Sequence, residues 1–264
     1  MLLLMKVLVA PALVAGVTLA VRRWGPRVGG WLSGMPTVAG PVLVFFAVEQ
    51  GPAFAAQAAH ATLTGLIGTV AFAVVYARMC IRLRWPTCLL LGWSVFMVTT
   101  YVLYTVSPPL AVSLGGLVTA SVIGRLVLPR VSDPPLSGGG HPRADLVLRV
   151  LATATLVLAL TAIARPLGAR LSGLLNAFPI LTTIITAFTH AQRGSAATVA
   201  FVNGFARSII GFGLFCAVLS LGLVRLGLLP ALAIALAVNA IASGLALRFA
   251  RRAVSPPREP PSGT

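Results

Sequence analysis

Acidic residues are almost absent from this chain. Its 264 residues include 4 Asp and Glu against 20 Lys and Arg, and only 9% of all residues are charged. The three cysteines form no C-x-x-C pair, so we expect neither a disulfide framework nor a metal site. The motifs of serine hydrolases, zinc proteases and phosphate-binding loops are missing as well. The sequence therefore predicts no enzyme activity and no cofactor.

Apolar residues dominate the composition instead. Hydrophobic residues make up 58% of the chain and its mean hydropathy is +0.99, values far above those of soluble domains. Stretches of about 20 apolar residues, each long enough to cross a hydrocarbon core of ~30 Å as a helix, recur along the chain. Lipid offers the backbone no hydrogen-bond partners, so these stretches must be helical. We predict an all-α, polytopic membrane helix bundle with about nine transmembrane helices, near residues 3–21, 33–49, 53–77, 86–104, 108–128, 146–164, 175–191, 196–222 and 229–248.

The net charge of +16 has two explanations. In a soluble protein it would suggest nucleic acid as a partner, but in a membrane protein it marks the cytoplasmic loops, and we favour this second interpretation. Assigning the loops alternately gathers most arginines on one side and leaves few basic residues on the other, namely Lys6, Arg165, Arg170 and Arg225. Arg207 lies within a predicted span. By the positive-inside rule we expect the N-terminus outside, the C-terminus in the cytoplasm, and no nucleic acid bound.

The chain repeats itself, without a gap, 143 positions later. Residues 22–36 read RRWGPRVGGWLSGMP, and residues 165–179 read RPLGARLSGLLNAFP. The register continues forward to Phe72 and Phe215 and backward to Lys6 and Arg149. The protein is therefore a duplicated unit.

The number of spans decides how the two copies are oriented. Each copy holds four predicted spans, and one span between them belongs to neither, so the second copy is expected to be inverted. We predict a first four-helix repeat at 1–106, a linking transmembrane helix and cytoplasmic loop at 107–144, a second, inverted four-helix repeat at 145–250, and a disordered cytoplasmic tail at 251–264. A parallel repeat, which needs an even number of spans per period, is the alternative. Inverted repeats are a common construction of alternating-access transporters.

Three motifs of the first copy carry a family resemblance: MKVLVAPALVAG, WLSGMPTVAGP and AVEQG. Each half resembles the four-span bacterial inner-membrane protein family called GlpM or YdgC. The resemblance covers nearly all of both halves, with the matched positions Lys6/Arg149, Gly30/Gly173, Leu32/Leu175, Pro36/Pro179, Glu49/Gln192 and Gly51/Gly194. That family is similar to small proteins thought to insert in both orientations and pair antiparallel, so the resemblance implies a fused inverted pair in the bacterial inner membrane. The second half departs from the pattern at Leu174, opposite Trp31, and at Gln192, so an acid-dependent role would belong to one half only.

Polar residues inside the predicted spans are candidates for a substrate site, because ionisable groups at bilayer depth are costly and usually face a bundle interior or a wet cavity. Arg207 lies about 13 residues beyond Gly194, or roughly 20 Å along a helix. Asn203 shares its face one turn earlier, and the same register offers His60 and Thr64 in the first copy. These four side chains could share one central cavity, in which Arg207 holds a carboxylate or phosphate and His60 titrates. Alternatively, Arg207 snorkels or pairs with a carbonyl, and the others join helices by hydrogen bonds.

Two prolines occupy matching positions near the beginnings of the second predicted span of each copy. Ser33 precedes Pro36, and Asn176 precedes Pro179. Interrupted helices in corresponding positions of two halves point to a transporter site, since their freed backbone groups and half-helix ends can hold ions. We expect Ser33 and Asn176 to line the path of the substrate. The alternative is a proline tolerated in the first turn of a helix.

Three charged residues are candidates for gating or coupling. Glu49 ends the second predicted span and could act as a coupling carboxylate, although an interfacial residue that terminates a helix is the alternative. Arg27 and Arg170 are present in both copies although inversion places them on opposite faces, which favours a gate or cap role in each. Snorkelling at a helix end is the alternative for either arginine.

These features favour a secondary transporter or exporter of a small solute, an anion being one candidate, which works by rocking inverted halves around a midplane cavity. The rival hypothesis is a non-transporting scaffold or accessory subunit of an envelope process, which a sealed, polar-free interface between the halves would favour. An intramembrane enzyme ranks third. The expected partners are the lipid bilayer and a small-molecule or ion substrate, with an ion gradient as the energy source, and homo-oligomerisation stays open.

Overall fold

The computed structural model describes residues 2–129, 131, 146–156 and 168–252. All the regular elements in these ranges are helices, so the predicted all-α class is confirmed for them. Most of the predicted cytoplasmic loop and tail, and the end of the span predicted at 146–164, lie outside the described residues.

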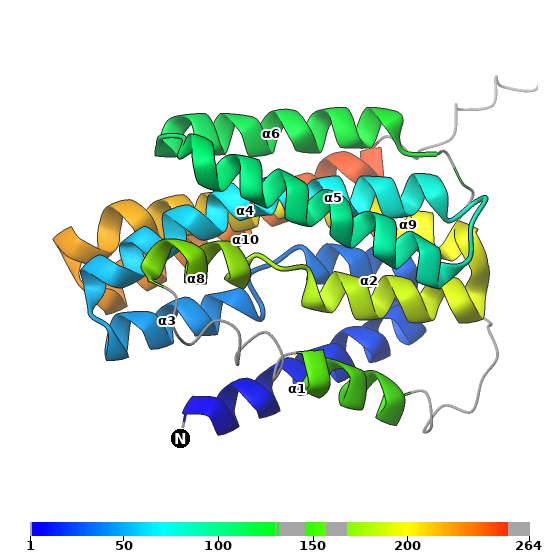
Figure 1. The fold of residues 1–264 in the computed structure, drawn as a ribbon, viewed down its shortest axis with the longest axis horizontal. Helices are drawn as coiled ribbons and strands as arrows, with labels where there is room; N and C mark the ends of the chain where they lie inside the picture. The colour runs from blue at the N-terminus through cyan, green and yellow to red at the C-terminus, as the bar shows by residue number, and fades with distance from the viewer. Residues whose placement is uncertain (1, 130, 132–145, 157–167, 253–264) are drawn as a thin grey trace, which may run out of the picture.

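The helices are long and run back and forth across the molecule (Figure 1). In chain order they are α1 (Leu2–Trp24), α2 (Pro26–Ser33), α3 (Ala39–Glu49), α4 (Pro52–Met79), α5 (Trp85–Val106), α6 (Leu110–Val127), α8 (Ala169–Asn176), α9 (Ile180–Leu226) and α10 (Leu228–Arg252), with a further apolar helix at Leu146–Leu156. Gly194 interrupts α9 with a φ of 78°, a left-handed value that glycine adopts without strain, so α9 consists of two helices. Gly51 has a φ of 88° at the equivalent position between α3 and α4.

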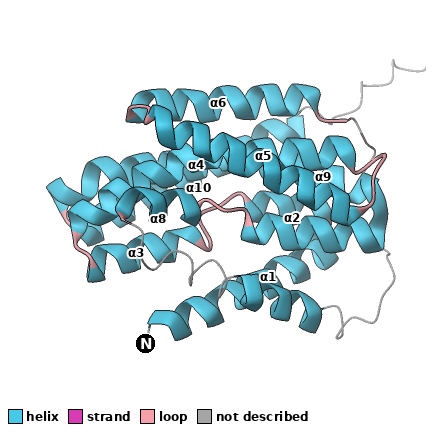
Figure 2. Ribbon diagram, in the orientation of Figure 1, coloured by secondary structure: helices cyan, strands magenta, loops and turns pink. Residues whose placement is uncertain are grey.

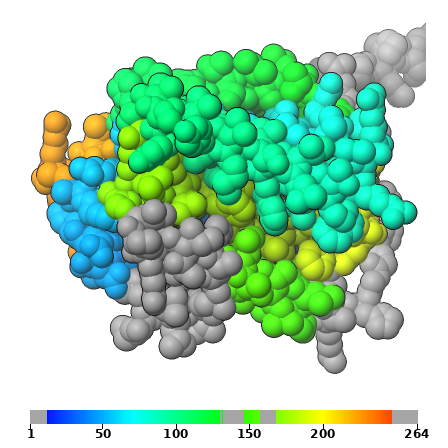
Figure 3. Space-filling view, in the orientation of Figure 1, coloured from blue at the N-terminus to red at the C-terminus, as the bar shows by residue number. Residues whose placement is uncertain are grey.

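The centre of the bundle is formed by α4 and the second part of α9. In the most apolar part of α4, 72% of the residues are buried, against 17% in α5 and 22% in α6. The largest fully buried side chains include Phe72 and Tyr76 on α4 and Phe201, Phe205 and Phe215 on α9. Helices α5 and α6 lie together along one side of this core (Figure 1) and cover the upper part of the face seen in Figure 3.

The outer helices present apolar side chains outward. Leu90, Val98 and Tyr101 on α5 are 63%, 64% and 68% exposed, and Leu126 on α6 is 80% exposed. So many exposed large apolar side chains are unfavourable in water and suit lipid. Five helices are long and apolar enough to cross a membrane, Pro52–Met79, Trp85–Val106, Leu110–Val127, Ala169–Leu226 and Leu228–Ala246, and they overlap the spans predicted at 53–77, 86–104, 108–128, 196–222 and 229–248. The chain thus has the features of a multi-pass membrane protein.

The second predicted span of each half, at 33–49 and 175–191, is not a continuous helix. Residues 34–38 interrupt the first, between α2 and α3, and residues 177–179 interrupt the second, between α8 and α9. A proline in each interruption lacks the backbone N–H that a helix needs. Each helix also begins earlier than predicted, with α2 or α8, so its break falls near its middle. The interrupted helices that the matching prolines indicated are therefore present, whereas the starting residues predicted for them, and the place of the prolines near those starts, are wrong.

Close backbone contacts join α2 to α9 and α8 to α4 at matching positions. Gly30 on α2 lies against Phe201, and Gly173 on α8 lies against Ala58. Phe201 stands 143 residues after Ala58, the same offset that separates Gly173 from Gly30. A β-carbon on Gly30 would lie 2.7 Å from the Phe201 carbonyl carbon, and one on Gly173 would lie 2.9 Å from the Ala58 Cα. Glycine is required at both positions because the helices touch through their backbones.

Contacts between the third and fourth helices of each half match in the same way. Gly68 on α4 packs against Thr100 on α5, and Gly211 on α9 packs against Ser243 on α10. Both pairs are related by the offset of 143 residues. The duplicated sequence is thus accompanied by duplicated contacts.

Candidate functional site

Two helix breaks cross in the middle of the bundle. In Figure 2 the linking segments 34–38 and 177–179 meet between α8 and α2, and the helices that they interrupt run in opposite directions. Asn176, the last residue of α8, joins the two breaks. Its Nδ2 donates a hydrogen bond of 3.3 Å to the carbonyl of Ala39, where α3 begins, and one of 3.3 Å to Oγ1 of Thr62 on α4.

Hydroxyl groups donate hydrogen bonds to carbonyls at and beside these breaks. A helix that ends in apolar surroundings leaves carbonyls without partners, which is costly. Thr62 Oγ1 shares its one proton between the carbonyls of Gly173, at 3.0 Å, and Ala58, at 2.8 Å, and Thr69 Oγ1 donates to the Ala177 carbonyl at 2.6 Å. In the other break, the buried Ser33 donates to the carbonyl of Gly29, one turn earlier in its own helix, at 2.9 Å. The crossing is therefore a polar region inside an apolar bundle.

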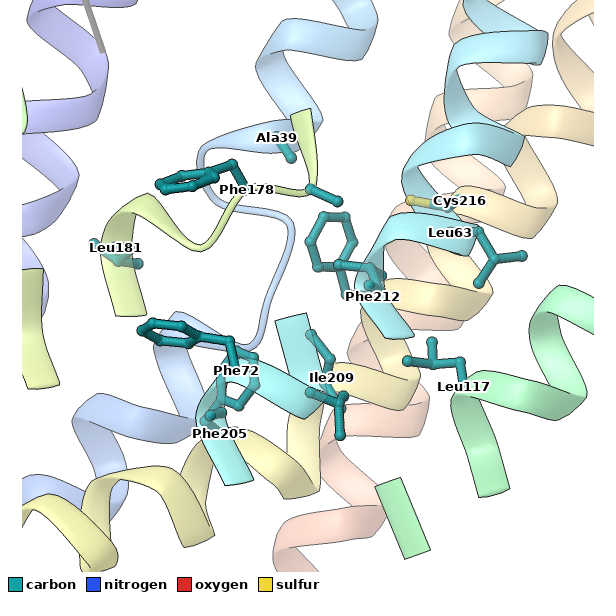
Figure 4. Packing of buried hydrophobic residues seen from close by; sticks show 14 of the residues in the cluster. Ala39, Leu63, Phe72, Leu117, Phe178, Leu181, Phe205, Ile209, Phe212 and Cys216 are labelled. Atoms are coloured by element: carbon teal, nitrogen blue, oxygen red, sulfur yellow. The ribbon is translucent and has the colours of Figure 1, made fainter. Parts of the chain in front are cut away.

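Four helix ends converge at this crossing. The N-termini of α3 and α9 carry partial positive charge and the C-termini of α2 and α8 carry partial negative charge. No side chain caps the N-terminus of α3 or of α9. Apolar side chains surround the crossing in this conformation, among them Ala39, Phe178, Leu181 and Phe212 (Figure 4). The Phe178 ring packs edge-to-face on Phe96 with centroids 5.2 Å apart.

A cavity of about 180 Å³ lies at the α8 end of the bundle, between α4, α8 and the turn that joins α5 to α6. Its polar lining comes from Gln57, His60, Thr64, Ser107 and Arg170. Two of these, His60 and Thr64, were predicted in a substrate site, and a third, Arg170, was predicted as a gate. The structure brings these three residues together.

A hydrogen-bond network holds the imidazole of His60 in this cavity. Thr64 Oγ1 and Ser113 Oγ lie 2.8 Å apart, and Ser113 Oγ lies 3.4 Å from His60 Nε2. Thr64 also donates to the His60 carbonyl at 3.1 Å. Ser113 is fully buried on α6. Ser113 could not be predicted as part of the site, since a lone serine in an apolar helix gives no indication of its contacts.

Arg170 supplies positive charge at the cavity. Its guanidinium carbon lies 4.4 Å from the centroid of the Tyr104 ring, and its Nη2 donates to the Tyr104 carbonyl. The one acid among the described residues, Glu49, is exposed at the end of α3, and Glu49 does not line the cavity. Arginine recognises carboxylate and phosphate oxygens through paired donors, so this cavity suits a small anion.

Asn203 and Arg207 do not line this cavity. Asn203 Nδ2 donates to the carbonyl of Val199 in its own helix at 3.1 Å, and Arg207 is half-buried on α9. The four side chains predicted around one central cavity thus fall into two groups in this conformation. His60 and Thr64 lie near α8, whereas Asn203 and Arg207 lie on the part of α9 that packs against α2.

The α2 end of the bundle is held by side chains that bond to distant carbonyls. Trp31 Nε1 donates to the Ser243 carbonyl on α10 at 3.2 Å. Arg27, the predicted gate on this side, donates from Nη2 to the Val131 carbonyl at 3.4 Å. Both bonds link α2 to segments far along the chain.

Glu49 and its counterpart Gln192 are both exposed. Gln192 Oε1 accepts a hydrogen bond of 3.2 Å from Arg149, whose guanidinium carbon lies 4.7 Å from the centroid of the Phe188 ring. Arg149 is only 5% exposed, so this contact ties the helix Leu146–Leu156 to the first part of α9. A coupling role for Glu49 stays a prediction.

No protein-family model matches the chain, and no curated protein or solved structure matches it either.

Proposed function

We propose that this protein is a secondary transporter or exporter of a small solute, which works by alternating access of two inverted repeats. The observation that carries the proposal is the crossing of two interrupted helices, which occupy corresponding positions in the two halves. Unwound segments of this kind provide the central binding sites of transporters built from inverted repeats, because they expose backbone groups and helix ends inside the bilayer.

The matched contacts support the inverted-repeat arrangement. Where Gly30 of the first half touches Phe201 of the second, Gly173 of the second touches Ala58 of the first. A contact that recurs with the halves exchanged is the signature of a twofold relation. A first half with four spans, followed by one linking helix, would place that twofold axis in the membrane plane.

The charge distribution supports a cytoplasmic C-terminus and an N-terminus outside. In that topology the cavity, at the α8 end, faces the outside. The resemblance of each half to the GlpM or YdgC family would place the protein in the bacterial inner membrane. Both assignments are parts of the proposal.

The mechanism follows from the cavity and the crossing. A small anion enters beside Arg170 and reaches His60 and Thr64, where paired donors replace its water. Rocking of α2 over α9, and of α8 over α4, closes this side and opens the α2 end. Gly30 and Gly173 carry only a hydrogen at these contacts, so no side chain interlocks the helices there as they move. An ion gradient supplies the energy, as no nucleotide-binding motif exists in the sequence.

The alternative is a membrane scaffold or accessory subunit. The tight backbone packing between the halves favours it, because the same contacts would also build a rigid bundle. The polar crossing at Asn176 and Thr62 argues against it, since a scaffold gains nothing from breaking two helices.

The rate at which introduced cysteines are labelled, measured on the protein in nanodiscs, distinguishes a transporter from a scaffold. Leu103→Cys reports on the cavity, and Ala246→Cys is its counterpart 143 residues later, at the α2 end. The three native cysteines are buried, so their background labelling is low. A charged, membrane-impermeant thiol reagent is applied with acetate, phosphate or sulfate, with Arg82→Cys, in an exposed loop, as the reference.

Alternating access predicts that an anion which slows labelling at one reporter speeds it at the other, while the reference stays constant. Arg170→Gln removes the response, and its symmetry mate, Arg27→Gln, retains binding at the cavity side. Reporters that never respond to any of the three anions would favour the scaffold.

A further inference from the structure

His190 and Tyr76 form a polar pair at the end of the bundle opposite the cavity. The Tyr76 hydroxyl lies 3.4 Å from His190 Nδ1, and the two rings meet edge-to-face with centroids 5.9 Å apart. Tyr76 is fully buried and His190 is half-buried. Tyr76 follows His60 on α4 by about 16 residues, or roughly 24 Å of helix. The pair and the cavity therefore lie on opposite sides of the helix crossing.

The pair does not belong to the duplicated framework. The residues 143 positions away are Leu219 for Tyr76 and Ala47 for His190, both apolar. Leu219 is only 1% exposed, so an aliphatic side chain fills the equivalent core position. Packing alone therefore does not require a tyrosine and a histidine here.

Among the described residues, the thiols of Cys80, after α4, and of Cys88, on α5, lie near the pair. Arg78 and Arg193 follow Tyr76 and His190 along their own helices, and Arg149, on the helix Leu146–Leu156, bonds to Gln192, two residues after His190. Arg78 is turned toward α6, where it donates to the Val127 carbonyl at 2.9 Å. The one acid that the structure describes ends α3 and is exposed. Histidine is the side chain whose ordinary charge change falls between pH 5 and 8, so His190 is the group at this end suited to taking up a proton.

We propose that the His190–Tyr76 pair is a proton-binding site that controls which end of the bundle opens. This inference rests on the proposed transport function and names its coupling ion. When His190 is neutral, the Tyr76 hydroxyl donates to Nδ1. When His190 binds a proton, Nδ1–H becomes the donor and the tyrosine hydroxyl turns to Thr186, one turn before His190. The imidazolium is more stable in water than between helices, so protonation separates α9 from α4 at this end and closes the cavity.

The two cysteine reporters test this coupling without a known solute. Labelling of Leu103→Cys and Ala246→Cys is measured in nanodiscs at about pH 5.5 and 8.5. Each rate is divided by that of the same reporter in a His190→Gln background at the same pH, which cancels the titration of the thiol itself. Suppose that acid raises the population of the conformation open at the α2 end from about a tenth to about half of the molecules. The labelling ratio of Ala246→Cys then rises about fivefold, while the labelling ratio of Leu103→Cys falls.

A second measurement follows the proton directly. In NMR spectra of protein with ¹⁵N-labelled histidine, the signals come from three imidazole rings, and the variants His141→Gln and His190→Gln assign the signals of two of these rings. We expect the His190 signal to titrate between about pH 5 and 8, and Tyr76→Phe to move its midpoint. A His190 ring that stays neutral down to about pH 5 overturns the proposal, as do pH-independent labelling ratios.

The outcomes also separate this inference from the proposed function. If anions switch the reporters in opposite directions while pH does not, alternating access stands and the proton site is refuted. If pH switches the reporters and the anions do not, the proton site stands and the anion specificity is refuted. Reporters that respond to neither refute both.

Discussion

An alanine at Gly30 or Gly173 is expected to destabilise the bundle strongly. The added β-carbon would lie 2.7 Å from the carbonyl carbon of Phe201 in the first case and 2.9 Å from the Cα of Ala58 in the second. Backbone atoms cannot move aside as a flexible side chain can, so overpacking should cost about 3 kcal/mol, the upper part of its usual range. The better helix propensity of alanine offsets up to about 1 kcal/mol, which leaves a net loss of roughly 2 kcal/mol.

Gly115→Ala is the matched control. A β-carbon on Gly115, in α6, meets nothing within 4 Å, so alanine should be neutral or stabilise by up to about 1 kcal/mol. Purified variants in one detergent are compared by tryptophan fluorescence during heating. A loss of roughly 2 kcal/mol corresponds to a fall in Tm of about 4–8 °C for a chain of this size.

Two results would refute the reasoning. If Gly30→Ala melts together with Gly115→Ala, the backbone contact between α2 and α9 does not exist in the protein. If Gly30→Ala and Gly173→Ala differ by more than a few degrees, the two contacts are not equivalent, and the twofold relation loses its main support.

Two further predictions concern the crossing, and a third concerns the thiol that follows α4. Thr62→Val removes the donor to the Gly173 carbonyl and should cost about 1–2 kcal/mol in thermal unfolding, whereas Thr119→Val, at an exposed position on α6, should be neutral; equal effects would contradict this. Phe178→Ala, at a side chain only 7% exposed, should cost about 3 kcal/mol by the same assay, and a loss below about 1 kcal/mol would mean that the crossing is not packed. Burial, together with a neighbouring thiol, raises the pKa of Cys80 to about 12, so this thiol stays protonated at about pH 8, and mass spectrometry should find it alkylated by iodoacetamide only after denaturation.

The apolar spans could be predicted because lipid imposes one simple rule on them. A stretch that faces lipid must be helical, apolar and about 20 residues long, and α5, α6 and α10 follow this rule closely. The rule fails for helices buried inside the bundle, where other helices can satisfy a broken backbone. This is why the span predicted at 33–49 begins at the last residue of α2 and leaves out the rest of that helix.

The cavity could be predicted only in part, for a related reason. His60, Thr64 and Arg170 were named because an ionisable or polar group in an apolar helix is conspicuous. Which of these residues lie together depends on which helices are neighbours. Tertiary packing brings the α5–α6 turn and Ser113 to the site, and a local sequence pattern does not show that packing. Arg207 was named by the same reasoning as His60, and it lies outside this cavity because it stands on the part of α9 that packs against α2.

The differences between the halves carry a meaning that their agreement does not. If the halves exchange conformations, as we propose, two identical repeats would give both open states the same energy, since each state would be the other turned over. A bias requires residues that differ between equivalent positions. Leu174 lines the cavity in this conformation, whereas Trp31, its counterpart, is hydrogen-bonded to α10 at the other end. The glycines that the packing demands are kept in both copies, whereas the side chains at the two ends have diverged, so under the proposed exchange the diverged side chains would set the bias between the two open states.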